Sequence, residues 1–221
     1  MKLPGRICHL VEASNWPSIQ RDGLLSASRL LHASGLIGAE RDRLGRAQRL
    51  THTALPSGVC LRDQLPMPPA ALDRCLCGMS PADWYAMVNS RVFFWLDPDR
   101  LNRQKAACKS RPQVVLVVDT AALIAAHEER IAVTPINAGN ARRKAARRGA
   151  ATFVPLAEWG RTGWASEAQA LEIPLRKRSH QPVELTILDG VPDILHVVIN
   201  VVPLHIGQPF IPSPPPLSGH S

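Results

Sequence analysis

Short apolar runs alternate with longer polar segments along the whole chain. The clearest run is Gln113–Val118, in which five apolar residues follow one glutamine. Ile7–Val11 and Val92–Leu96 are also mainly apolar. Runs of this length are typical of strands that are covered on both faces. The pattern therefore predicts three buried strands in the first 118 residues.

Further strands are predicted towards the C-terminus. Val183–Leu188 and Ile194–Val202 are separated by Asp189-Gly190, a dipeptide that favours a tight turn. Shorter candidate strands cover residues 59–61, 131–136 and 152–154. Strands therefore dominate the second half of the chain.

Helix start signals precede several of the polar segments. Asn15 stands before Trp16-Pro17, and Ser80-Pro81 has Asp83 in the first turn that follows. Asp97-Pro98 and Asp119-Thr120 are further starts of this kind, and Gly23 ends the first helix. We expect helices over 16–23, 26–32, 68–75, 80–88, 98–107 and 120–129.

The segments without clear periodicity are predicted to be loops. These are residues 34–58 and Leu156–Gln181. The proline-rich stretch 208–221 is predicted to be a flexible tail after a single domain over 1–207. Helices mostly in the N-terminal half and strands in the other half indicate an α+β fold rather than a doubly wound sheet.

Composition adds a strong positive charge to this picture. The 221 residues contain 26 Lys and Arg against 18 Asp and Glu, giving a net charge of +8. An excess of this size favours a polyanionic partner, with nucleic acid ahead of a membrane. No apolar stretch reaches the roughly 18 residues of a membrane span, and no signal-peptide core follows Met1. Five irregularly spaced cysteines indicate reduced thiols, so we expect a cytoplasmic protein with no membrane partner.

Common cofactor and metal motifs are absent from the sequence. It contains no GxGxxG, GxxxxGK[ST], HExxH or GxSxG. These absences argue against a Rossmann dehydrogenase, a P-loop NTPase, a zinc protease and an α/β-hydrolase. No His or Cys pair has convincing metal spacing, so we expect no metal.

One carboxylate stands out, because Glu184 lies inside the apolar run Val183–Ile187. Glutamate is depleted in strands. Simple alternation would turn it outward, opposite to Val183 and Leu185, as a solvated residue. A functional carboxylate is the alternative. Arg91 and Arg62, at the ends of short strands, carry the same ambiguity.

Three segments resemble the DarT-type DNA ADP-ribosyltransferases. Ile7–Val11, followed by Asn15–Ile19 and Gly23–Leu25, is similar to a family strand with a histidine, a helix near "LPSI" and a following "GLL". Asn89–Trp95 resembles the family's aromatic strand. Val183–Ile187, followed by Val191-Pro192, resembles the strand that carries the catalytic glutamate.

The sequence also departs from that family. Cys8–Val11 lacks a second histidine, and Leu96–Asp99 replaces the "RSPM" that follows the aromatic strand. Residues 34–88 have no clear counterpart. The resemblance therefore indicates a diverged member of the ADP-ribosyltransferase superfamily, whose acceptor need not be single-stranded DNA.

The resemblance implies two facing, mainly antiparallel sheets around a cleft that holds NAD as a substrate. Glu184 would be the catalytic carboxylate, which stabilises an oxocarbenium-like transition state and orients the nucleophile. Arg62 or Arg91 would bind the pyrophosphate, and Arg62 is also a catalytic candidate. His9 would bind the NAD ribose or carboxamide. Aromatic candidates for stacking on nicotinamide, which could equally be core, are Tyr85, Phe94 and Trp95.

In the family the loop before the glutamate selects the acceptor, and here it would be Glu158–Gln181. Aromatic rings between cations suit unstacked bases and phosphates. The predicted nucleic-acid-binding residues of this loop are Trp159, Arg161, Trp164, Arg176, Lys177 and Arg178. A second basic group is Arg142, Arg143, Arg147 and Arg148. A solvated loop and a protein acceptor are the alternatives.

The sequence therefore predicts an NAD-dependent ADP-ribosyltransferase that modifies DNA or RNA. By family, it would be the toxin of a toxin–antitoxin pair with an antitoxin protein as partner. Two other functions stay open, namely an RNA 2′-phosphotransferase and a non-catalytic nucleic-acid-binding protein on the same fold. The last is favoured if His9 and Glu184 do not share a cleft.

Overall fold

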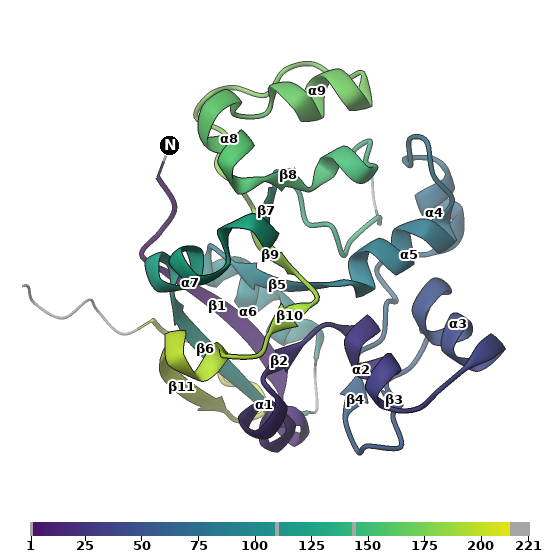
Figure 1. The fold of residues 1–221 in the computed structure, drawn as a ribbon, viewed down its shortest axis with the longest axis vertical. Helices are drawn as coiled ribbons and strands as arrows, with labels where there is room; N and C mark the ends of the chain where they lie inside the picture. Colours follow the sequence, from purple (N-terminus) through teal and green to yellow (C-terminus); the bar gives the residue numbers. More distant parts are fainter. Residues whose placement is uncertain (1, 109–110, 143–144, 213–221) are drawn as a thin grey trace, which may run out of the picture.

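The computed structural model describes residues 2–108, 111–142 and 145–212. Seven strands form one antiparallel sheet in the order β11-β6-β1-β5-β9-β7-β8 (Figure 1). The strands are β1 Arg6–Glu12, β5 Arg91–Trp95, β6 Gln113–Asp119, β7 Ile131–Thr134, β8 Val154–Pro155, β9 Glu184–Leu188 and β11 Val198–Leu204. The predicted α+β class is confirmed.

The seven strands form one sheet rather than two separate facing sheets, but that sheet has a weak junction. β1 pairs with β6 over seven residue pairs, and β5 with β9 over five. β1 and β5 share only the pair Cys8 and Trp95. The two halves, β11-β6-β1 and β5-β9-β7-β8, are therefore joined by a single position of the ladder.

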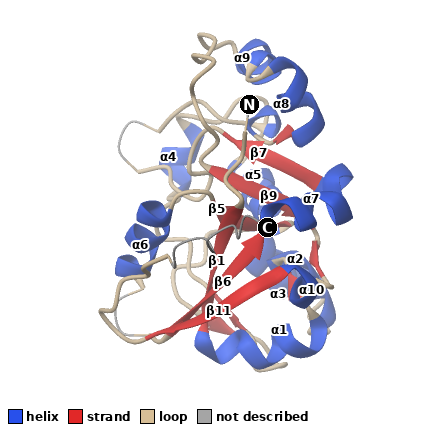
Figure 2. Ribbon diagram, turned by 90° about the vertical axis from the view of Figure 1, so that its left-hand side faces the viewer, coloured by secondary structure: helices blue, strands red, loops and turns tan. Residues whose placement is uncertain are grey.

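The helices lie on both sides of the sheet, with α4 and α6 on one side and α7 and α10 on the other (Figure 2). Start signals expected from the sequence are present: Ser80 and Asp83 form a capping box, and Asp97 and Asp119 cap the helices that follow. The helices are α1 Trp16–Asp22, α2 Ala27–Ala33, α3 Gly38–Arg46, α4 Pro69–Asp73, α5 Pro81–Asn89, α6 Pro98–Ala107, α7 Thr120–His127, α8 Leu156–Thr162, α9 Ala165–Leu171 and α10 Ile194–Val197.

Two apolar clusters cover the two faces of β9. Leu185 and Ile187 lie in the main core, together with residues of α1, α7 and α8. On the opposite face, Trp84 and Tyr85 of α5 form a second cluster with Phe153. Glu184 and Thr186 are consequently buried as well. The expectation that Glu184 faces solvent is wrong, because this part of the sheet is covered on both sides.

The segment 34–58 was expected to be a loop, but it contains α3 and the short strand β3 Thr53–Ala54, which pairs with β4 Cys60–Leu61. α3 buries only Leu44, which packs with Leu31 and Leu55. A helix with one buried position leaves little hydrophobic periodicity in its sequence, and this explains why the pattern did not show it.

The predicted turn at Asp189-Gly190 does not join two neighbouring strands. β9 pairs with β5 and β7, whereas β11 pairs with β6 at the edge of the sheet. Gly190–Val191 forms β10, which pairs with β2 Leu24–Leu25. A Cβ on Gly190 would lie 2.5 Å from the Leu24 carbonyl oxygen, so this close approach requires glycine.

The C-terminal boundary also differs from the prediction. Phe210 is buried and exchanges two hydrogen bonds with the Asn102 side chain of α6. The start of the predicted tail, from residue 208, is thus packed on the domain. The remainder, 213–221, lies outside the described residues.

Candidate functional site

A cavity of about 540 Å³ lies at the junction of β1 and β5. Its volume falls in the range of small-molecule sites, about 300–1,000 Å³. The residues that line it include five site residues predicted from the sequence, namely His9, Arg62, Arg91, Trp95 and Glu184. They come from β1, β5 and β9, which are neighbours in the strand order, and from the loop after β4, which belongs to a separate two-stranded sheet (Figure 1). We call this cavity the junction cleft.

Glu184 begins β9, opposite Trp95 of β5 and Thr134 of β7. Its side chain is 3% exposed. Oε2 accepts hydrogen bonds from the Ala138 N–H and the Thr134 hydroxyl, both at 3.0 Å. Burial raises the pKa of Glu184 to about 7, against the effect of these donors. The carboxyl group is therefore divided between its two protonation states near neutral pH.

His9 bridges the junction with its ring. Nδ1 lies 2.7 Å from the Phe93 carbonyl oxygen of β5. Burial lowers the pKa of His9 to about 4, so the ring is neutral at pH 7. Because a carbonyl only accepts, Nδ1 carries the hydrogen and Nε2 is an acceptor. His9 thus presents a hydrogen-bond acceptor in the junction cleft, which it lines.

Arg91 is held by stacking rather than by an acid. Its guanidinium carbon lies 4.5 Å from the centre of the Phe153 ring. Burial lowers the pKa of Arg91, and its Nε is buried without a hydrogen-bond partner among the described residues. A buried donor without a partner calls for an explanation, and an acceptor on a bound ligand would provide one.

Arg62 is already engaged in a charged network. Its Nη2 donates to Gln113 Oε1 at 2.7 Å and to Glu12 Oε1 at 3.2 Å. Glu12 also accepts from Arg111 at 3.2 Å and from Gln113 at 2.7 Å. Arg62 therefore fixes one end of the junction cleft, while Arg91 has the greater unused donor capacity.

Cations outnumber acids around the junction cleft. The arginines that line it are Arg49, Arg62, Arg91, Arg100, Arg103 and Arg111, and the acids are Glu12, Asp63 and Glu184. Arg49 is committed to the protein, since it donates to Arg62 O, Leu44 O and Asn89 Oδ1. Glu12, Arg49, Arg100, Arg103 and Arg111 also line the cleft but were not predicted from the sequence. Arg100 and Arg103 lie three residues apart on one helix face. This spacing was the only local indication in the sequence that any of these residues could act together at a site.

Asn15 has a different role from the predicted helix cap. It makes no side-chain cap bond on α1. Its amide instead donates to Cys60 O and accepts from Cys60 N, both at 2.8 Å. This pair of bonds fixes β4, and with it Arg62, to the mouth of the junction cleft.

Tyr85 and Phe94 are core residues. Tyr85 is 2% exposed, and its hydroxyl donates to Met67 O at 2.5 Å. Phe94 is fully buried in the main core. Neither lines the junction cleft. The role in stacking on nicotinamide suggested for Tyr85 is therefore corrected, and Trp95 is the aromatic candidate that remains.

The predicted nucleic-acid-binding tryptophans are also core residues. Trp159 and Trp164 are each 2% exposed, and their ring centres lie 6.0 Å apart. The segment that holds them was expected to be a polar loop, but it forms α8 and α9. A role in base stacking is corrected for both rings, because their faces are covered by protein.

The predicted cations divide into two groups. Arg176 makes a bidentate pair with the buried Glu167, at 2.7 and 2.8 Å, and Arg148 is only 2% exposed. Both side chains are bound by other groups of the protein, and their assignment to a phosphate-binding surface is corrected. Exposed cations are Arg142, Arg147, Arg161, Lys177 and Arg178. Arg143 lies outside the described residues.

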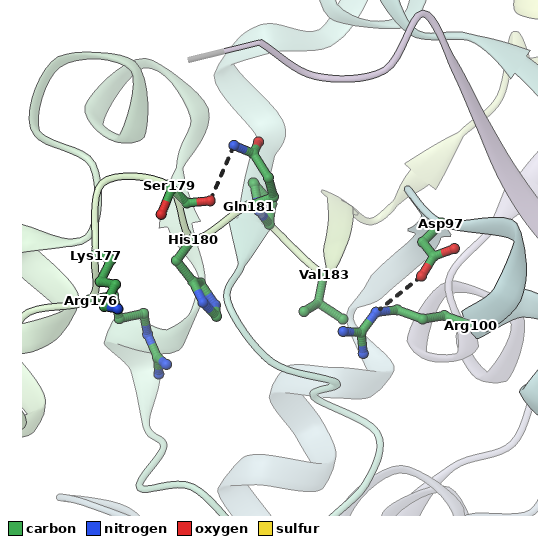
Figure 3. Close-up of a pocket in the computed structure, with 9 residues that line it drawn as sticks. Asp97, Arg100, Arg176, Lys177, Ser179, His180, Gln181 and Val183 are labelled. Atoms are coloured by element: carbon green, nitrogen blue, oxygen red, sulfur yellow. Dashed lines mark hydrogen bonds and ion pairs between the residues drawn. The ribbon is translucent and has the colours of Figure 1, made fainter.

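A second cavity, of about 660 Å³, adjoins the junction cleft. Figure 3 shows Arg176 and His180 on one side of it, Arg100 on the other and Val183 between them. Arg100 lines both cavities, and Val183 directly precedes Glu184. The second cavity therefore opens beside the catalytic candidate and is bordered by cations.

The fold and the junction cleft define an α+β protein with a cleft beside the junction between the two halves of its antiparallel sheet. The sequence profile of DUF7002, a family of unknown function, matches residues 5–198, and the chain belongs to this family. No curated protein and no solved structure matched it. Within the described residues no group of His, Cys, Asp or Glu could hold a metal ion, and no helix is long and apolar enough to cross a membrane.

The buried Glu184 is expected to make stability pH-dependent. Its folded pKa of about 7 exceeds its ordinary value of 4.5. The stability that it contributes is thus fully present below pH 4.5 and is lost as pH rises through 7, by about 3 kcal/mol. Urea unfolding between pH 5 and 8.5 should show this loss in the wild type and not in Glu184→Gln. Parallel pH profiles of the two proteins would contradict it.

Proposed function

We propose that this protein is an NAD-dependent ADP-ribosyltransferase that acts in the junction cleft. The observation that carries the proposal is that Glu184, Arg91 and His9, from three different strands, line one cavity. Their sequence contexts resemble the corresponding segments of DarT-type enzymes. The division of one sheet into two halves beside the cavity is compatible with the two-sheet architecture of that superfamily.

The reaction would break the bond between nicotinamide and ribose, leaving positive charge on the ribose. A preorganised carboxylate at that point stabilises the transition state, and in a buried site it acts strongly. Glu184 is suited to this role in its ionised form. Its Oε1 accepts no hydrogen bond from the described residues, so that oxygen is available to a ribose hydroxyl or an incoming nucleophile.

Other residues of the junction cleft would hold NAD in place. The NAD pyrophosphate carries two negative charges, and the guanidinium of Arg91, which lines the cleft, would donate to it. Arg62 would add a second cation from the opposite side. The Nε2 atom of His9 would accept from a ribose hydroxyl or from the carboxamide. Trp95 would face the nicotinamide ring.

Nucleic acid is the proposed acceptor. The net charge of +8 and the exposed cations Arg142, Arg147, Arg161, Lys177 and Arg178 support it. Because Trp159 and Trp164 are covered, contact would be made through phosphates rather than through ring stacking. Binding should therefore weaken steeply with salt, by about 0.7 log units per log unit of salt for each neutralised phosphate of a single strand.

The test is incubation with NAD labelled in its adenylate portion. Separate reactions would contain DNA, RNA, 2′-phosphorylated RNA or total protein, with nicotinamide release and label transfer measured. Label on DNA or RNA in a Glu184-dependent manner supports the proposal. Dephosphorylation of 2′-phosphorylated RNA would identify the phosphotransferase alternative. No NAD cleavage in any pool, and no NAD binding by calorimetry, would contradict the proposal.

Arg91→Met should weaken NAD binding by roughly ten- to a hundredfold. A hydrogen bond to a charged group contributes about 1.5–3 kcal/mol, and methionine keeps much of the apolar stem. Calorimetric titration with NAD measures the effect, with the exposed Arg161→Met as a control that should bind normally. Unchanged affinity in a folded Arg91→Met protein would place the pyrophosphate elsewhere.

A further inference from the structure

Arg148 is a buried cation that has no ion-pair partner within the described part of the chain. The residue is 2% exposed, and none of the ion pairs found there includes it. Buried charges in proteins are normally paired. Arg148 instead donates to two backbone carbonyls, Ala146 O at 3.2 Å and Ala138 O at 3.3 Å, and its side chain also hydrogen-bonds the buried Cys75 thiol, whose raised pKa keeps it neutral. Its guanidinium also lies 5.7 Å from the Trp84 ring centre.

Ala138 connects this cation to the junction cleft. While its carbonyl accepts from Arg148, its own N–H donates to Glu184 Oε2 at 3.0 Å. Ala138 is fully buried. Arg148 and the carboxyl group of Glu184, neither of which has an ion-pair partner in the described ranges, therefore lie on either side of Ala138 and are linked through its two backbone polar groups.

Of the two hydrogen-bond donors to Glu184, the Ala138 N–H is the one that has no competing acceptor. The Thr134 hydroxyl lies 2.7 Å from Ile136 O and 3.0 Å from Glu184 Oε2. A hydroxyl has one hydrogen and can serve only one of these acceptors at a time. Donation to Ile136 leaves the Thr134 oxygen to accept from protonated Glu184. The ionised carboxylate depends more on Ala138.

We propose that Arg148 is a positioning residue of this site, which holds Ala138 so that its N–H donates to Glu184 and which compensates the charge of the buried carboxylate. The proposal rests on the proposed function for its catalytic consequence. Its structural part, the link from Arg148 to Glu184, is independent of any NAD reaction.

The other charged groups near Glu184 are less suited to this role. Arg100 of α6 acts on its pKa in the same direction, but is 40% exposed and lies 3.6 Å from Asp97. Arg91 of β5 stacks on Phe153, and the low pKa of His9 on β1 leaves that ring neutral. Arg148 is the charged group buried on the Ala138 side.

A purely structural role makes a different prediction. If Arg148 only anchors the loop between β7 and β8 to Trp84, its replacement lowers stability without changing the ionisation of Glu184. The ionisation of Glu184 is therefore the property to measure. Carboxyl infrared difference spectra, with Glu184→Gln as the reference, follow this single group as a function of pH.

Arg148→Met should move the Glu184 titration midpoint upward by about one pH unit, because it removes a nearby opposite charge. At pH 7 the ionised fraction would then fall roughly fivefold. Arg147→Met removes one cation from the adjacent exposed position and should leave the midpoint unchanged. If NAD is cleaved, the low-pH limb of the rate should move with the midpoint and activity should recover at high pH.

Arg148→Lys separates charge compensation of Glu184 from the positioning of Ala138. It also tests the proposal if the Arg148→Met protein does not fold. Lysine keeps the charge but lacks the planar fork of arginine. The midpoint should stay within about half a unit of the wild type, since such shifts follow charge. Amide hydrogen exchange at Ala138 should accelerate at least about tenfold, with Arg147→Lys as control.

A shifted midpoint without NAD cleavage would reject the proposed function and keep this inference. Unchanged midpoints in Arg148→Met, or unchanged exchange at Ala138 in Arg148→Lys, would overturn the inference.

Discussion

Glu184→Gln should reduce NAD cleavage by roughly a hundred- to a thousandfold while leaving the fold intact. The amide has the same shape as the carboxyl group, and its oxygen can accept from Ala138 and Thr134. It lacks the negative charge that would face the developing charge on the ribose, and losses of this size follow removal of a single preorganised electrostatic partner. Nicotinamide release measures cleavage, and circular dichroism with urea unfolding verifies the fold.

The exposed Glu172→Gln is the matched control, since it makes the same chemical change outside the junction cleft. It should cleave NAD at the wild-type rate. Wild-type cleavage by a folded Glu184→Gln protein would remove Glu184 from the mechanism and leave the proposed function without its carboxylate.

Trp164→Ala should lower the free energy of unfolding by about 3–5 kcal/mol, the usual cost of deleting a large buried aromatic side chain. The Trp164 ring packs against Trp159 and His180, and its Nε1 donates to His180 O at 2.8 Å. Urea unfolding measures the change.

Lys177→Ala, at an exposed position of the following segment, should remain within about 0.5 kcal/mol of the wild type. A Trp164→Ala protein of normal stability that fails to bind nucleic acid would contradict the core assignment and restore the stacking role.

Elements whose local pattern is strong were predictable from the sequence. β1, β5 and β6 are mainly apolar runs, and the caps at Ser80, Asp97 and Asp119 are local signals that the structure retains. α3 was missed because it buries a single residue. The turn at Asp189 was misassigned because a tight turn indicates a local reversal but does not specify which distant strand receives the next segment.

The site was predictable only in part, because local sequence patterns do not specify which distant segments come together. That His9, Arg91 and Glu184 line one cavity follows from the order β1-β5-β9, which depends on pairing between strands far apart in the sequence. Basic residues were expected at the surface, yet Arg176 is neutralised by Glu167 and Arg148 is held by carbonyls. Whether a basic side chain is neutralised or held by other groups depends on the three-dimensional structure, and the amino-acid composition does not reveal it.

The weak junction between β1 and β5 leaves most of the contact between the two half-sheets to side chains. Within the described residues Cys8 and Trp95 are the one main-chain pair there, and His9 adds a hydrogen bond to the Phe93 carbonyl and a ring contact with Phe94, with centres 5.6 Å apart. One such hydrogen bond contributes only about 1 kcal/mol. Main-chain pairing therefore contributes little to holding the two half-sheets together. Side chains of β1 and β5 that pack in the same apolar clusters, such as Ile7 with Phe94 and Cys8 with Trp95, supply most of the contact across this line.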